Sequence, residues 1–489
     1  MHDGRFQRAG IIAAALALAG CGAGETPERP ITPEGGAAFA ERLETARIAM
    51  REGDLVQAGR LYDEAFALEP SNPALWVDIA RLRYRGGEHF GAIETAERAL
   101  ALDGTFAPAL LLRGQMVRDA HGPADALAWF EAALEIDPGN PDIHAEYAAT
   151  LGELGRYTDM LHAVRTLARV APDHPQVHYL QAVLAARAQD PVLARTLLSQ
   201  SGLAEAGVPA AMLLDALIHM QQGTHDTAAD ILETLAARQP ANNRIAELLA
   251  KAWWMGGRDR AVVERFEEVA RDDAASPYLA MLVGRSLERL GERDRAIPFI
   301  ERARRRAGVG PISLPSSEDM PAMTRDLRYR LALGDGAAGA AILGEFPQSA
   351  DAHMLAGDAA FIEGDTLRAI DLYQTAAQVR RPWALTRKLV AAYRAAGADR
   401  AADALLLRHA AAEPQNGDAL IMLARRSLLA EDWLRADLLL SRAAQLGIGT
   451  DPAILDLRAQ AARGLGYDEA ARQFDQARMH LAPRLLAPL

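Results

Sequence analysis

A chain that repeats at a short fixed interval can fold only as a row of similar units, and this sequence repeats every 34 residues from Phe39 onward. Two series of small residues and one of bulky residues run in phase through eight units. The first comprises Ala46, Ala80, Gly114, Ala148, Ala182, Ala216, Ala250 and Gly284. The second comprises Ala58, Ala92, Ala126, Met160, Ala194, Ala228, Val262 and Ala296. The third comprises Tyr62, Phe130, Val164, Leu198, Leu232, Phe266 and Ile300, with Ala96 as the exception. Because helices approach closely only where side chains are small, these series predict two packed helices in every unit.

The residues between the series predict where each helix ends. Glycines suited to a left-handed helix cap stand in the middle of most units, at Gly53, Gly87, Gly155, Gly223, Gly257 and Gly291, although Gln189 replaces the glycine of the fifth unit. Prolines that stop the second helix follow at Pro70, Pro138, Pro172 and Pro240. The pattern resembles the tetratricopeptide repeat (TPR). This resemblance implies an all-α fold, a right-handed α-solenoid of about thirteen helix–turn–helix units.

The phase of the repeat breaks once. After Ala296 the next clear match is Ala369, five residues late, and the prolines at 311, 315 and 321 fall in between. We therefore expect units 1–8 over residues 39–310, an irregular unit or insertion over 311–349, units 10–13 over 350–484, and a tail over 485–489. The irregular stretch is either a junction between two arms or a surface loop on a continuous superhelix.

The amino-terminal segment has the layout of a secretory signal. Arg5 and Arg8 precede an apolar run over residues 11–19, which is too short to span a bilayer, and the chain's single cysteine, Cys21, follows Gly20. The sequence Leu18-Ala19-Gly20-Cys21 resembles the lipobox of bacterial lipoproteins. It implies a signal peptide over residues 1–20, acylation of Cys21, and a flexible lipidated tether over residues 21–38. An ordinary signal peptide with an incidental cysteine is the alternative. Gly22 after the cysteine favours a periplasm-facing position on the outer membrane.

Several kinds of chemistry are not expected. The net charge of −12 lacks the basic field that nucleic-acid binding requires. No metalloprotease, P-loop or nucleophile-elbow motif occurs, so we expect no catalytic residue, no cofactor and no enzyme activity. His174 and His178 have metal-like spacing but no third histidine nearby, and we expect no metal site.

The first helices of such repeats line a concave groove, and the side chains one turn apart on them predict its wall. In units 5–8 this wall is mainly aliphatic and aromatic, which is typical of a surface for an amphipathic helix or extended protein segment. The predicted groove residues are Tyr179, Leu180, Val183, Leu213, Leu214, Leu217, Met220, Trp254, Met255, Tyr278, Met281, Leu282 and Arg285. An error in helical phase would instead place part of this set in the core between repeats.

These features together resemble bacterial TPR lipoproteins of exopolysaccharide secretion, pilus biogenesis and outer-membrane assembly. The leading hypothesis is a lipid-anchored periplasmic scaffold that binds protein partners in such an envelope machine. The alternatives are a superhelix that binds polysaccharide or peptide and a non-catalytic accessory of an envelope enzyme.

Overall fold

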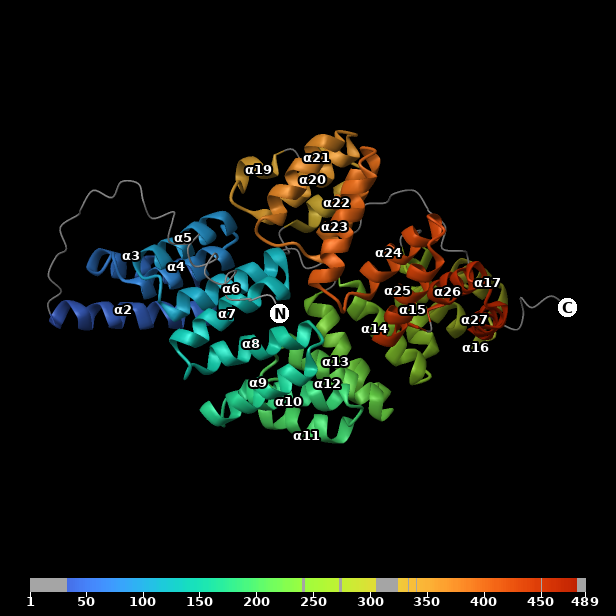
Figure 1. The fold of residues 1–489 in the computed structure, drawn as a ribbon, viewed down its shortest axis with the longest axis horizontal. Coiled ribbons are helices and arrows are strands. Elements are labelled where there is room, and N and C mark those ends of the chain that lie inside the picture. The colour runs from blue at the N-terminus through green and yellow to red at the C-terminus, as the bar shows by residue number, and fades with distance from the viewer. Residues whose placement is uncertain are drawn as a thin grey trace, which may run out of the picture. The chain divides into compact units, whose positions relative to one another are not determined.

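A computed structural model describes residues 33–239, 242–271, 275–304, 324–332, 334–339, 341–449 and 451–481. Every regular element in these ranges is helical, and consecutive helices form antiparallel pairs (Figure 1). The predicted all-α repeat solenoid is therefore confirmed. Cys21, the predicted signal peptide and the predicted tail lie outside these ranges. No helix within them is both long enough and apolar enough to cross a membrane.

Eight helix pairs precede the phase break. They are α2 (Pro33–Glu52) with α3 (Leu55–Leu68), α4 (Pro73–Arg85) with α5 (His89–Leu102), α6 (Ala107–His121) with α7 (Pro123–Ile136), α8 (Pro141–Glu153) with α9 (Tyr157–Val170), α10 (Pro175–Arg187) with α11 (Pro191–Ser201), α12 (Pro209–Gln222) with α13 (His225–Arg238), α14 (Asn243–Met255) with α15 (Asp259–Arg271), and α16 (Pro277–Arg289) with α17 (Arg293–Arg304). The first helix of each pair is the helix that the repeat pattern predicts to line the concave groove.

Three short helices and four further pairs follow. The short helices are α18 (Arg325–Ala332), the 3₁₀ turn η2 (Gly336–Gly339) and α19 (Ile342–Glu345). The pairs are α20 (Ala350–Ile362) with α21 (Thr366–Ala377), α22 (Trp383–Ala395) with α23 (Asp399–Ala412), α24 (Gly417–Leu429) with α25 (Trp433–Ala443), and α26 (Pro452–Gly464) with α27 (Asp468–Leu481). A π-helical turn, η3 (Ala444–Ile448), continues α25.

The two helices of a pair touch where the repeat places small residues. A Cβ atom added to Gly114 would lie 2.6 Å from Phe130 Cε1, and one added to Gly284 would lie 2.5 Å from Ile300 Cγ1. Both glycines precede the facing bulky residue by sixteen positions in the chain. The alanines of the two small series are buried. The sequence periodicity thus identifies the contact line between paired helices.

The turns inside the units adopt the left-handed backbone conformation that the glycines predict. Gly53 has φ 88° and Gly291 has φ 82°. Gln189, at the glycine position of the fifth unit, has φ 62°, and Glu431 takes the same conformation with φ 57° in the turn before α25. These two non-glycine residues carry a cost in backbone strain that glycine would avoid.

The first helix begins earlier than expected. We expected a tether to residue 38, whereas α2 begins at Pro33. Proline suits the first turn of a helix because its missing N–H would have no partner there. Farther along, Phe39 and Leu43 are buried in one cluster with Ala46, so this helix is part of the first repeat.

The described helices form two compact units. Of the described residues, those at 33–143, 341–356 and 374–381 form unit 1, and those between 144 and 339, between 357 and 373 and between 382 and 481 form unit 2. The chain crosses between the two units at residue 143, again at 339, which is within the irregular stretch 311–349, and three more times between 356 and 382. Within unit 1, hydrogen bonds join the amino-terminal repeats to the two later segments of the chain. The amide of Ala350 donates to His89 Nδ1 at 3.1 Å, and the amide of Arg381 donates to the Asp119 carbonyl at 2.8 Å.

Unit 2 contains a buried charged network. Asp358 on α20 accepts a hydrogen bond from the Tyr373 hydroxyl at 2.7 Å and another from the Lys388 ammonium. Lys388 is only 1% exposed. Burial lowers the pKa of Lys388, and the neighbouring Asp358 carboxylate opposes that shift. The network links the first helices α20 and α22 of two consecutive repeats through α21.

Candidate partner-binding groove

The structure divides the thirteen predicted groove residues into three groups, all in unit 2. Leu180, Met281 and Leu282 are buried, and Leu180 and Leu282 have almost no exposed surface. Leu217 and Met255 are 37% and 41% exposed. The others are partly buried: Tyr179, Val183, Leu213, Leu214, Met220, Trp254, Tyr278 and Arg285. Side chains that reach solvent therefore lie on α10, α12, α14 and α16, and the two most exposed of them lie on α12 and α14.

Two buried clusters support this wall from behind. Tyr179 and Leu214 pack against a cluster that contains Ala182 and Ile218. Leu213, Met220, Trp254 and Tyr278 pack against a buried cluster that runs from α12 to α17. Because each of these side chains rests on a fixed core, the wall is formed before any partner arrives, which lowers the entropic cost of binding.

Two arginines of α16, Arg285 and Arg289, lie among the predicted groove residues or contact them. The Arg289 guanidinium lies over the Trp254 ring, 4.2 Å from its centroid, and donates to the Trp254 carbonyl at 2.8 Å. Arg285 forms an ion pair with Glu288 at 3.1 Å. The Trp254 ring is therefore held by a cation–π contact. Periodicity does not indicate the Arg289–Trp254 contact, because it depends on the side-chain conformation of a residue in the next repeat.

Charged groups from the last two repeats lie close to the wall on α14 and α16. Burial and the nearby Glu247, together with Asp451, raise the pKa of Tyr278 to about 12. Burial also raises the pKa of Glu247, and the nearby carboxylates Asp418 and Asp451 act in the same direction. Asp418 is on α24 and Asp451 caps α26, and α26 contacts α16 and α17. The repeat pattern does not predict contacts between segments so far apart in the chain.

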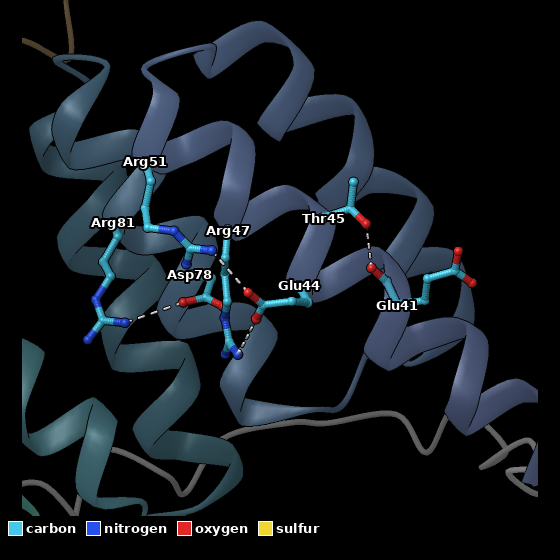
Figure 2. A network of polar contacts seen from close by, with 7 residues as sticks. All are labelled: Glu41, Glu44, Thr45, Arg47, Arg51, Asp78 and Arg81. Carbon is cyan, nitrogen blue, oxygen red and sulfur yellow. Dashed lines mark hydrogen bonds and ion pairs between the residues drawn. The ribbon is translucent and has the colours of Figure 1, made fainter.

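The corresponding face in unit 1 is ionic. The buried Asp78 of α4 binds Arg47 of α2 at 2.6 Å and Arg81 at 3.3 Å, and Glu44 binds Arg51 at 3.1 Å (Figure 2). Arg47 and Arg81 each follow the small contact residue of their helix by one position, as the apolar Val183 and Leu217 do in later units. Positions that carry apolar side chains in the fifth and sixth 34-residue repeats thus carry a salt-bridge network in the first and second repeats.

No metal site is built by the residues in the ranges described above, since they contain no group of three or more histidine, cysteine, aspartate or glutamate side chains arranged to hold an ion. The groove offers apolar side chains, aromatic rings and framing arginines. These groups suit binding of a polypeptide segment.

Models of the tetratricopeptide repeat match the chain over residues 49–115 and 118–184, and over 91–141, 213–261 and 327–382. No curated protein matches the sequence.

Several solved structures are similar to parts of the chain. Pseudomonas aeruginosa pilF has 18% identity and a TM-score of 0.36, covering 45% of this chain and 99% of its own. PilW, described as a widely conserved type IV pilus biogenesis factor, has 19% identity and a TM-score of 0.34, with coverage of 43% and 98%. A tetratricopeptide repeat protein of Parabacteroides merdae has 20% identity and a TM-score of 0.28, with coverage of 54% and 92%. Because tetratricopeptide repeat models match the sequence and the structure consists of the corresponding helix pairs, the chain belongs to the tetratricopeptide repeat family.

Proposed function

We propose that this protein is a lipid-anchored, periplasm-facing scaffold whose groove holds a protein partner of a bacterial envelope machine. The observation that carries the binding role is the partly exposed apolar wall on α10, α12 and α14. Leu217 and Met255 extend from this wall into solvent, while the side chains around them rest on the core. Exposed apolar surface on a rigid support generally marks a binding site in a soluble domain.

Anchoring rests on the sequence alone. The single cysteine stands at the position that a lipobox requires, and several acyl chains on Cys21, at about 0.8 kcal/mol per buried CH₂, would hold the mature protein on a membrane. Metabolic labelling with a fatty acid should tag the wild type and not Cys21→Ala. Equal labelling of both, or release of the wild type into the soluble fraction, refutes the anchor.

Partner binding is tested on the exposed residues of the wall. The tagged lipoprotein, solubilised in detergent, should co-purify with a protein partner, and Leu217→Glu should reduce that recovery at least tenfold. Its melting temperature should stay within about 2 °C, because an exposed surface substitution changes stability by less than about 0.5 kcal/mol.

Leu193→Glu provides the matched control. Leu193 is exposed on the second helix α11, outside the groove, and its substitution should leave recovery of the partner unchanged. Equal recovery with Leu217→Glu and the wild type would show that the wall on α12 does not bind the partner.

A further inference from the structure

One repeat position on the first helices changes from apolar to basic along unit 2. The residue that follows the small contact residue is Val183 on α10, Leu217 on α12, Lys251 on α14 and Arg285 on α16. Leu217 is 37% exposed, and the other three are partly buried. Because the repeat pattern predicts that this position lines the groove, the wall presents apolar side chains on two helices and cations on the next two.

Lys251 differs from the arginines at the same repeat position in having no counterion. Arg47 and Arg81 both bind the Asp78 carboxylate, at 2.6 Å and 3.3 Å, and Arg285 has a glutamate partner at 3.1 Å. Within the described ranges, the Lys251 ammonium forms no ion pair and no hydrogen bond. Its charge is therefore not balanced by the protein itself.

The carboxylate nearest to Lys251 along α14 is engaged elsewhere. A glutamate four residues before a lysine ordinarily pairs with it on a helix, and Glu247 stands at that position. The Glu247 carboxylate instead lies 3.8 Å from Arg244 and accepts a hydrogen bond from the Ser276 hydroxyl before α16. Burial lowers the pKa of Lys251, and the charge of Arg244 acts in the same direction. A carboxylate brought by a partner would stabilise the charged form of Lys251.

Exposed apolar side chains stand on both sides of this cation. Leu217 lies on the preceding first helix, and Met255, 41% exposed, lies one turn beyond Lys251 on α14. Packed helices are about 8–10 Å apart, which an extended segment spans in about three residues. An acidic polysaccharide would offer carboxylates but no apolar side chain for Leu217 and Met255, so the combination favours a polypeptide.

We propose that Lys251 is a specificity-determining residue of the groove, and that the partner segment carries a carboxylate close to an apolar anchor. The Lys251 ammonium pairs with that carboxylate, while Leu217 and Met255 contact the anchor. Charge complementarity of this kind also rejects segments with a basic residue at the same place. This inference rests on the proposed use of the groove for protein binding.

A random peptide library is the probe, selected on the tagged full chain with Cys21→Ser so that acylation plays no part. The enriched peptides should combine an apolar residue with Asp or Glu at a spacing of about two to four residues. Lys251→Met, which retains the aliphatic stem, should enrich the apolar residue without the acid. Lys251→Glu should enrich Lys or Arg instead, and Lys251→Arg should keep the preference for acids.

Affinities then measure the pair directly. An enriched acidic peptide is compared with its analogue in which Gln or Asn replaces the acid. The analogue should bind the background chain at least tenfold more weakly, and the two peptides should bind Lys251→Met within twofold of each other. Arg265→Met is the matched control, because it removes a cation from an exposed position of α15, the second helix of the same pair. It should retain the full discrimination.

Thermal unfolding checks that each variant keeps its fold, and Lys251→Gln is measured under the same criteria if Lys251→Met is destabilised. Enrichment of apolar residues with no preference for acids overturns the inference and leaves the proposed function standing. An acidic preference that persists in Lys251→Met does the same.

The inference is also wrong if no peptide is enriched, or if alginate, an acidic polysaccharide, binds through Lys251 and acidic peptides do not. Recovery of a protein partner through Leu217 decides the proposed function separately, because that measurement does not depend on the charge of Lys251.

Discussion

Replacing Lys388 by methionine removes an ammonium group from beside a buried carboxylate. Asp358 keeps its hydrogen bond from the Tyr373 hydroxyl but loses the charge-assisted one from Lys388. Breaking a buried ion pair on one side costs about 3–5 kcal/mol, since the remaining charge stays in a medium that solvates it poorly. Lys388→Met should therefore destabilise α20, α21 and α22 by that amount.

The double variant Lys388→Met/Asp358→Asn separates charge from packing. Asparagine can still accept from Tyr373, and no buried charge of the pair remains. Replacing both members of a buried pair is often close to neutral, so the double variant should recover most of the loss, with a coupling energy near the upper end of about 0.5–3 kcal/mol.

Hydrogen exchange is the appropriate assay because repeat arrays open locally rather than in one transition. Amides of α20 and α22 in Lys388→Met should exchange roughly 10²–10³-fold faster or more, at 1.36 kcal/mol per decade. Lys251→Met, at the only other lysine, is the control and should change exchange by less than tenfold because Lys251 is only partly buried. An unchanged rate in Lys388→Met, or a double variant no better than the single, refutes the reasoning.

Three further outcomes are expected from the packing. Burial lowers the pKa of His89, so its neutral ring is favoured in the folded state; stability is complete above the unfolded pKa of about 6.5 and is lost as pH falls toward the folded value. The Ala350 amide, which donates to His89 Nδ1, should therefore lose exchange protection below pH 6.5, whereas it should lose none in that range in His89→Gln. Gly284→Ala should lower stability by about 1–3 kcal/mol, because its Cβ would meet Ile300, and thermal unfolding measures this. Gly59→Ala, with its nearest neighbour at 3.7 Å, should raise stability by up to about 1 kcal/mol; a loss there would contradict the packing argument.

Local periodicity predicted most of the fold. The spacing from Gly114 to Phe130 identified which residues meet within a pair, since that contact involves only neighbouring segments of the chain. Even Gln189, an exception in composition, takes the left-handed conformation required at its position. The early start at Pro33 has no clear sequence signal, because the glycines and prolines of residues 22–36 are typical of a flexible tether, although proline also suits a first helical turn.

The candidate groove was predicted less completely for a different reason. Leu217 and Met255 are exposed as a groove wall requires, but Leu180, Met281 and Leu282 are buried. A small error in helical phase is enough to place such residues in the core between repeats, because neighbouring positions on a helix differ by about 100°.

Hydrogen bonds inside each unit join turns that are far apart in the sequence, which bears on the order of folding. Ala350 bonds to His89 across 261 residues in unit 1, and Gln415 bonds to Tyr157 across 258 residues in unit 2. An ordinary repeat array can fold progressively from its first unit, because each unit needs only its neighbour. Here the turn at His89 lacks this contact until the segment 261 residues later in the chain is in place. The early repeats must therefore remain incompletely bonded until then, and a chain interrupted before residue 350 would retain the His89 turn without its closing contact.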